Sequence, residues 1–568
     1  MAHKWDILKS YPDLVEGKWP TIPALFEIAV RRFPNNNSFT VIESGKETYT
    51  YKEEYEEIKK AAFLLHAAGL KKGDVVMING KNSREWATAY FATSYAGCIV
   101  TPIDNQMKIE RVAELGEFAE VKYVFADEDV LDKLKELDNA WFKSIKGKTA
   151  LKAKTDKYSK IYKLDNEPLK EMVHLNENDV AAILFTSGTT GNEKGAVLTH
   201  ANITSDAYQA ADGMGVDETD TLYALLPLHH SYCCTAVLIE SVLHGAECLF
   251  GHGIVVSRMI NDMKNGGVTV FMGIPLLYNK LLAGIEKQLK AKSAFTFGMV
   301  NALMNYNLWC KVHFGKTPMK NFFNKNILAK LGLDHAKLLI CGAGPLAGEV
   351  FKKYQALGLN FLQGYGLTET SPILTLNPPE HFKTDSVGKV FPFVDMIIAD
   401  KDSDGVGEIR VKGDNICLGY LKDKEHTDEL FDENGYLCTG DLGYLDDDNY
   451  LFLKGRKKNL IVTEGGKNVY PEEIEDMFQL YSDIDQILIR GFQLKPNVPS
   501  ESIEAVIHPS SEYSKGKDKA EIEKHINEIV SEVNKNLVGY KKIEKITILD
   551  EAMEVTTTQK IKRRTVKA

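Results

Sequence analysis

The sequence has few cysteines, and no pattern joins them. Eight are scattered over 568 residues, and none lies in a Cys-x-x-Cys pair or in the Cys/His spacing of a zinc site. This excludes a disulfide-stapled framework and favours a reducing cytosol. The start, Met1-Ala2-His3, lacks the apolar core of a signal peptide, and no uninterrupted apolar run could span a bilayer. We therefore expect a cytoplasmic protein, soluble or peripheral on the inner face of a membrane.

Basic residues are fewer than acidic ones, with 69 Lys and Arg against 79 Asp and Glu. The formal net charge is −10, which argues against a nucleic-acid partner. Hydrophobic residues make up 44% of the chain and charged residues 26%, as in ordinary globular proteins. A chain of 568 residues is too long for one hydrophobic core, so at least two domains are expected.

Apolar strand-like runs alternate with helical patterns through most of the chain. Residues 75–78 predict a buried strand, 83–95 a helix and 97–103 the next strand. This alternation favours an α/β fold with parallel sheets covered by helices. Beyond residue 385 the segments become β-rich, as at residues 408–411, which indicates a β-rich subdomain.

The best domain boundary lies near Gly455-Arg456-Lys457-Lys458. The segment that follows has the size of a small domain and contains strand-like runs at 485–489 and 505–507 and a helical pattern at 520–537. We predict a large N-terminal domain, residues 1–455, and a small, mobile α+β C-terminal domain, residues 456–568.

A loop rich in Gly, Ser and Thr follows the apolar run 181–185. Its backbone N–H groups, hydroxyls and one cation are the groups that a polyphosphate needs. It is not a Walker A motif, because Glu193 precedes Lys194 and Gly195 follows it. The candidate ATP ligands here are Thr186, Ser187, Gly188, Thr189, Thr190, Gly191 and Lys194.

Further motifs along the chain carry groups suited to a nucleotide. The ring of Tyr365 can stack on adenine. Thr368 can hold a phosphate oxygen, and Glu369 can hold Mg²⁺, which prefers hard oxygen ligands beside phosphates. Asp441 suits ribose hydroxyls. The complete set of candidates adds Gly342, Ala343, Gly344, Pro345, Gln363, Gly364, Gly366, Arg456 and, near the C-terminus, Lys560.

The order of these motifs, from residue 186 to residue 560, resembles that of the adenylate-forming (AMP-binding) superfamily, which includes acyl-CoA synthetases, luciferases and peptide-synthetase adenylation domains. The resemblance covers the chain from about Thr48 to Arg564. It implies two steps: a carboxylate attacks the α-phosphorus of Mg-ATP to give acyl-AMP and pyrophosphate, and a thiol then displaces AMP.

The same resemblance implies roles for single residues. Lys194 and Mg²⁺ would serve the leaving pyrophosphate, and Lys560 would reach the carboxylate and α-phosphate oxygens in the first step. Lys458 matches the hinge about which the C-terminal domain rotates for the second step. Gly465 or Gly466 would line the thiol channel; the loop 463–467 is one residue longer than the commonest pattern, so the choice between them stays open.

The segment 226–232 resembles that of long-chain fatty acyl-CoA synthetases, with His230 as a gate between acyl and nucleotide sites. No Asp lies between Leu225 and Glu240 to hold a substrate amine, which disfavours amino acids. We predict a medium- to long-chain fatty acid and coenzyme A as substrates. The alternatives are a fatty acyl-AMP ligase that loads a carrier-protein thiol, an aryl or short-chain acid:CoA ligase, and a non-catalytic lipid-binding scaffold.

Residues 287–330 combine eight lysines and seven aromatic residues with no Asp or Glu. In an acidic protein such a segment suits an anionic membrane surface. The alternative is an amphipathic helix pair packed on the core, with the lysines extending to water.

Overall fold

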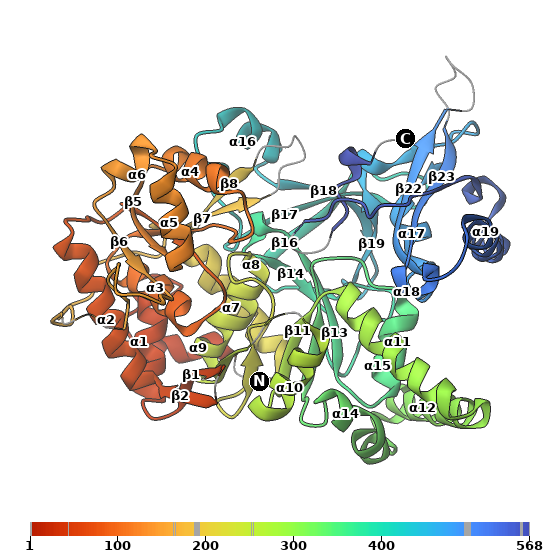
Figure 1. Ribbon diagram of the computed structural model, residues 1–568, viewed down its shortest axis with the longest axis horizontal. Helices are drawn as coiled ribbons and strands as arrows, with labels where there is room; N and C mark the ends of the chain where they lie inside the picture. Colours follow the sequence, from red (N-terminus) through yellow and green to blue (C-terminus); the bar gives the residue numbers. More distant parts are fainter. Residues whose placement is uncertain are drawn as a thin grey trace.

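The computed structural model describes residues 3–43, 45–162, 164, 166–186, 193–251, 253, 255–493, 501–556 and 560–566. Figure 1 shows the N-terminal elements in red and orange on one side and the C-terminal elements in blue on the other.

The first sheet has six strands. Its neighbours pair in parallel except β7 and β8, which are antiparallel. Helices α3 (Arg84–Tyr95), α4 (Ile109–Phe118), α5 (Glu128–Glu136) and α6 (Ala140–Ser144) lie between or after its strands in the chain. In spatial order the strands are β6 (Gly147–Ala150), β5 (Val121–Ala126), β3 (Val75–Asn79), β4 (Ile99–Pro102), β7 (Val180–Thr186) and β8 (Lys194–Thr199).

The second sheet has nine strands, parallel in its centre and antiparallel at both edges. Its central strands β10, β11 and β12 are buried at every residue, which explains their continuous apolar runs. The spatial order is β15 (Lys389–Val390), β14 (Ile373–Leu376), β13 (Phe361–Gly366), β12 (Leu338–Cys341), β11 (Val270–Gly273), β9 (Thr221–Tyr223), β10 (Glu247–Phe250), β1 (Asn37–Ile42) and β2 (Lys46–Thr50).

The helices around this sheet begin and end at typical capping residues. Thr50 forms a capping box with Glu53 at the start of α2, and Gly315 ends α12 in the left-handed conformation. The helices are α1 (Ile22–Arg32), α2 (Tyr51–Ala67), α7 (His200–Met214), α8 (Ser231–Cys233), α9 (Glu240–His244), α10 (Val256–Gly266), α11 (Pro275–Lys292), α12 (Ala294–Phe314), α13 (Lys320–Phe323), α14 (Ala329–Leu331) and α15 (Gly348–Ala356).

A four-stranded antiparallel sheet follows, which confirms the β-rich segment predicted beyond residue 385. It runs β16 (Val394–Ala399), β17 (Gly407–Gly413), β18 (Leu437–Leu445) and β19 (Leu451–Arg456), with α16 (Lys424–Leu430) between β17 and β18 in the chain.

The C-terminal elements have a hydrophobic core of their own, formed by residues between Ile461 and Ile543. Helix α19 (Lys519–Lys535) contributes Ile526, Ile529, Val530 and Val533, the spacing of one helical face. The other elements are β20 (Ile461–Val462), β21 (Asn468–Val469), α17 (Pro471–Asp476), β22 (Ile484–Phe492), β23 (Ser502–Pro509), α18 (Ser511–Ser514) and β24 (Ile543–Ile548). The α/β fold class is as predicted; a domain boundary near residue 455 stays a prediction.

The bounds differ slightly from those predicted. The helix predicted at 83–95 begins at Arg84, because the Ser83 side chain accepts a hydrogen bond from the Trp86 N–H as its N-cap. The strand predicted at 97–103 is the shorter β4, since Gly97 has a positive φ of 75° and belongs to the preceding turn. In the described part of the chain, no helix is both long and apolar enough to cross a membrane.

Candidate nucleotide and acyl site

The predicted phosphate loop connects two paired strands. Thr186 ends β7, Lys194 begins β8, and the two residues face each other in the antiparallel register. Arg111 on α4 holds the far end of the loop, since its Nε donates to Glu193 at 2.8 Å. The predicted ligands Ser187, Gly188, Thr189, Thr190 and Gly191 lie outside the described residues.

Tyr420 connects Lys194 with Glu369. Its hydroxyl donates to the Glu369 carboxylate at 2.7 Å, and the Lys194 ammonium lies 5.1 Å from the centre of its ring. Burial and the neighbouring Glu369 raise the pKa of Tyr420, so the phenol stays protonated and donates. The backbone fixes its place, because Leu421 N–H donates to the Gly195 carbonyl at 2.8 Å. No motif in the sequence points to Tyr420.

The turn after β13 brings Thr368 to the start of α8. Gly366 is required there, because a Cβ at this residue would lie 1.6 Å from the Pro372 carbonyl oxygen. Thr368 begins a short 3₁₀ turn, and Ser231 donates to its hydroxyl at 3.3 Å. Ser231 follows His230 directly, so the predicted phosphate-binding threonine and the predicted acyl gate are adjacent.

Tyr365, Asp441 and Arg456 form a chain of polar contacts. The Tyr365 hydroxyl donates to one Asp441 oxygen at 2.7 Å, and Arg456 Nε lies 2.7 Å from the other. Asp441 and Arg456 are direct partners on β18 and β19. Burial raises the pKa of Asp441, and the Arg456 guanidinium opposes that shift. These contacts place three predicted ATP-binding residues, separated by up to 91 positions in the sequence, in one cluster.

The predicted element Gly342–Pro345 follows β12, beside Gln363 on β13. Gln363 is buried, and Gly364 follows it on the same strand. A Cβ on Gly342 would lie 2.9 Å from the ring of Tyr232, which accounts for glycine here. Ala343 has a positive φ of 64°, whereas Gly344 and Pro345 continue the turn. These residues lie at the carboxyl ends of parallel strands, where ligands bind in α/β sheets.

His229 and His230 lie against each other, with ring centres 4.2 Å apart. Burial lowers the pKa of His229 to about 4 and that of His230 to about 3. Both rings are therefore neutral near pH 7. Besides burial, the charge of Lys560 also lowers the pKa of His230.

Lys560 interacts electrostatically with three residues predicted to bind ATP or Mg²⁺. Its charge interacts with those of Arg456, Asp441 and Glu369, and burial of its ammonium, with Arg456 nearby, lowers its pKa although the residue is exposed overall. Its backbone is held in turn by a 3.1 Å hydrogen bond from Lys560 N–H to the Thr556 hydroxyl.

Two predicted features, the glycines of the thiol channel and the hinge lysine, lie outside the cluster around Glu369 and Asp441. Gly465 and Gly466 lie in an exposed turn between β20 and β21, and a Cβ on either would have no described atom within 4 Å. Lys458 lies in the 3₁₀ turn Lys457–Asn459 between β19 and β20. Their predicted roles as channel and hinge remain predictions.

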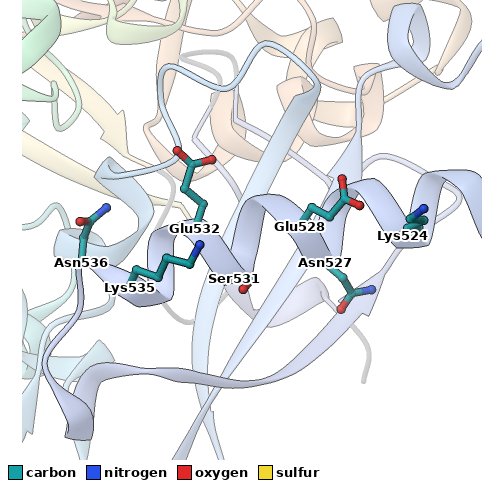
Figure 2. A pocket seen from close by; sticks show the side chains of 7 residues that line it. All are labelled: Lys524, Asn527, Glu528, Ser531, Glu532, Lys535 and Asn536. Atoms are coloured by element: carbon teal, nitrogen blue, oxygen red, sulfur yellow. The ribbon is translucent and has the colours of Figure 1, made fainter.

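A surface hollow elsewhere does not belong to this site. It lies on the outer side of α19, and Figure 2 shows that its lining side chains come from that helix and the residue after it. One helix cannot enclose a ligand as a cleft does. The lining residues are Lys524, Asn527, Glu528, Ser531, Glu532, Lys535 and Asn536.

Metal binding at the cluster would depend on few protein ligands. Among the described residues, no three His, Cys, Asp or Glu side chains gather as a metal site. Mg²⁺ in nucleotide sites typically takes one or two carboxylates plus phosphate oxygens and waters. Glu369, with Thr368 beside it, provides hard oxygen atoms of that kind.

Comparison with known proteins agrees with this geometry. The model of the family described as AMP-binding enzyme matches residues 26–421. The chain belongs to the AMP-binding enzyme family. Of this family, the long-chain-fatty-acid–CoA ligase ACSBG1 of Rattus norvegicus is 28% identical over 81% of this chain and 67% of its own length. ACSBG2 of Homo sapiens, also a long-chain-fatty-acid–CoA ligase, is 28% identical over 80% of this chain and 72% of its own.

Solved structures share the fold. MatB from Rhodopseudomonas palustris, bound to ATP, has a TM-score of 0.74 and 23% identity, covering 96% of this chain and 98% of its own. The anthranilate CoA ligase AuaEII, in complex with anthranoyl-AMP, has a TM-score of 0.77 at 18% identity and covers 96% of each chain. MenE from Bacillus subtilis, with ATP and magnesium, has a TM-score of 0.71 at 21% identity, covering 95% and 98%.

Proposed function

We propose that this protein activates a medium- to long-chain fatty acid with ATP, forming acyl-AMP and pyrophosphate, and then transfers the acyl group to coenzyme A. The observation that carries the proposal is the position of Lys560, whose charge interacts with Glu369 and Asp441 and reaches His230. These interactions support a single site to which Lys560, Glu369, Asp441 and His230 all contribute.

The charges of this cluster suit the first step. A carboxylate and a triphosphate are both anions, so the enzyme must neutralise charge that develops at the α-phosphate. Lys194 and the loop before it would bind the phosphates that leave as pyrophosphate. Thr368 would hold a phosphate oxygen, and Lys560 would bind the carboxylate and α-phosphate oxygens. Mg²⁺, held by Glu369, would neutralise phosphate charge.

The nucleoside would lie between the carboxyl ends of the parallel strands β12 and β13 and the antiparallel sheet that carries Asp441. Tyr365 would stack on adenine beside Gly342–Pro345, and Asp441 would hold the ribose hydroxyls. Asp441 is already oriented by Tyr365 and Arg456, each at 2.7 Å, so it needs little rearrangement when the ribose binds.

The segment that resembles the acyl gate carries no charge. His230 is uncharged near pH 7, and the segment from Leu225 to Ile239 contains no Asp or Glu. A carboxylate from another part of the chain, Asp104, lies 3.8 Å from the ring of His229. The uncharged segment itself suits an alkyl chain better than a substrate ammonium. The similarity to two long-chain-fatty-acid–CoA ligases supports the same choice.

The second step would use a different arrangement of the small domain, residues 456–568, reached by rotation near Lys458. Gly465 and Gly466, exposed here, would then line the channel for the pantetheine thiol. Coenzyme A is the proposed acceptor. The alternative acceptor is a carrier-protein thiol, as in fatty acyl-AMP ligases, and an aryl or short-chain acid is the alternative substrate.

A product assay distinguishes these alternatives. The purified protein, ATP and Mg²⁺ would be supplied with fatty acids of graded length or aryl acids, together with coenzyme A or a pantetheinylated carrier protein. We expect acyl-CoA and AMP in equal amounts from fatty acids. Acyl-AMP that accumulates with coenzyme A but is consumed by the carrier would favour the ligase alternative, and preference for aryl acids would overturn the fatty-acid proposal.

We also propose that segment 287–330 contacts an anionic membrane on its cytoplasmic face. Helix α12 lies at the edge of the molecule (Figure 1). One of its sides packs inward through Val300, Met304, Asn307 and Cys310. The rest of the helix surface exposes large apolar side chains: Phe295, Met299, Tyr306, Trp309, Val312 and Phe314.

The exposed apolar surface of α12 has a lysine near each end of the helix. Lys292 precedes α12 and Lys316 follows it, and both are exposed. Lys311 is different, because its ammonium donates to Gln355 at 2.6 Å and to the Leu359 carbonyl at 2.8 Å. A helix with an exposed apolar side and flanking cations suits the interface of an anionic bilayer, where fatty acid is dissolved.

A further inference from the structure

Arg563, three residues after Lys560, ties the C-terminal segment to α17. One of its terminal nitrogens lies 2.7 Å from each carboxylate oxygen of Glu475, and the other donates to the Ile489 carbonyl at 2.8 Å. Two nitrogens of the guanidinium thus contact two different acceptors, and charge-assisted hydrogen bonds of this kind fix direction as well as distance. Glu475 is itself held, because it accepts the Ile489 N–H at 2.7 Å.

The Arg563 guanidinium also contacts a second carboxylate, and further contacts connect that carboxylate with the nucleotide cluster. Arg563 lies 3.5 Å from Glu472, and Glu472 accepts from Asn459 at 2.7 Å. Glu472 also packs against Gly455, where a Cβ would lie 2.5 Å from its carboxylate oxygen. Gly455 precedes Arg456, the partner of Asp441. A continuous set of contacts therefore connects the segment of Lys560 with the proposed ribose site.

We propose that Arg563 is a positioning residue that, through Glu475 and Glu472, aims Lys560 at the reacting carboxylate and α-phosphate. The inference rests on the proposed function, in which Lys560 acts in the first step. Hydrogen bonds with Thr556 hold the backbone of Lys560, and the Arg563 contacts tie the same segment to α17 through a side chain.

Other contacts keep the segment folded when Arg563 is changed. Ile561 packs beside a buried cluster of Leu488, Val506 and Met553. Arg490 donates to the Val566 carbonyl at 3.2 Å. We therefore expect Arg563 variants to fold, with Lys560 present but less well aimed.

The test is a double-mutant cycle on the full chain. Arg563→Ala, Lys560→Ala and the double variant would be compared in fatty-acid-dependent exchange of labelled pyrophosphate into ATP, with thermal unfolding measured for each. Lys562→Ala is the matched control, since its ammonium lies in the same segment but 4.0 Å from Glu554 rather than against α17. Arg563→Lys tests whether the paired contacts matter beyond the charge.

We expect Arg563→Ala to slow exchange by about 100-fold, the scale of a small misplacement of a catalytic group, while Lys562→Ala changes it little. Arg563→Lys should recover only part of the rate. In the Lys560→Ala background, removal of Arg563 should have no further effect.

Two results would overturn the inference: a normal exchange rate in Arg563→Ala, or losses that multiply in the double variant. Normal exchange in Lys560→Ala alone would instead contradict the proposed function. If Arg563→Ala fails to fold, Glu475→Gln would replace it in the cycle with Lys560→Ala. A normal exchange rate in Glu475→Gln, or losses that multiply in its double variant, would then overturn the inference.

Discussion

The Tyr420 hydroxyl donates a 2.7 Å hydrogen bond to the Glu369 carboxylate. This bond orients the carboxylate that would hold Mg²⁺, and the ring of the same tyrosine lies beside the Lys194 ammonium. Mutation of a group that orients a metal ligand typically lowers metal affinity or activity by about 10- to 100-fold.

Tyr420→Phe should keep the ring and remove the donor. We expect the Mg²⁺ concentration for half-maximal pyrophosphate exchange to rise about tenfold, with a loss of stability of about 1 kcal/mol. Tyr436→Phe is the control, because Tyr436 donates to Asp395 at a surface position. Magnesium titration of both variants measures the difference; equal Mg²⁺ requirements would contradict the role given to Tyr420.

Gly465→Ala should separate the two half-reactions. A Cβ there has no described atom within 4 Å, so we expect unfolding free energy to change by less than about 0.5 kcal/mol and pyrophosphate exchange to persist. Thioester formation from supplied acyl-AMP and coenzyme A should fall if Gly465 lines the thiol channel.

Gly466→Ala is the matched comparison for this test. Its φ of 66° makes alanine strained, at a cost of about 1 kcal/mol. The variant that loses thioester formation while it keeps exchange identifies the channel glycine. Normal thioester formation in both glycine variants would contradict a role for this loop in the second step.

Stability should depend on pH through Asp476. Burial, with Glu475 nearby, raises its pKa from 3.8 to about 7 in the folded protein. Because the folded form holds the proton more tightly, this contribution to stability is complete below pH 3.8 and is lost as pH rises through 7. Asp476→Asn should flatten the stability curve over this window and be more stable by about 1–3 kcal/mol at pH 8.

Chemical unfolding at a series of pH values measures this effect. Asp550→Asn, at an exposed position, is the control and should leave the curve unchanged. Parallel curves for wild type and Asp476→Asn would contradict the assignment.

Membrane contact should depend on α12. We expect the protein to sediment with vesicles that contain phosphatidylserine and much less with phosphatidylcholine alone. Phe295→Ser with Trp309→Ser should reduce binding, and Lys292→Glu with Lys316→Glu should reduce it by more than about tenfold at low salt. Val538→Ser, an exposed apolar side chain elsewhere, is the control. Unchanged sedimentation of the α12 variants would contradict the proposed membrane contact.

Local sequence predicted much of the architecture. The α/β class and the strand and helix at 75–95 follow from apolar periodicity, and Thr368 and Glu369 stand in a contiguous motif. Arg111 and Tyr420 could not be found in this way, because their partners are remote in sequence: Tyr420 is 51 positions from Glu369 and Arg111 is 82 positions from Glu193. Only the fold brings such residues together, and no sequence motif indicates which residue each of them contacts.

The most direct test of the account is exchange of labelled pyrophosphate into ATP by the purified protein with Mg²⁺ and a panel of fatty acids. We predict exchange that requires a fatty acid, and near-complete loss of it in Lys560→Ala. Absence of exchange with every acid in a broad panel, or full exchange without Lys560, would contradict the account.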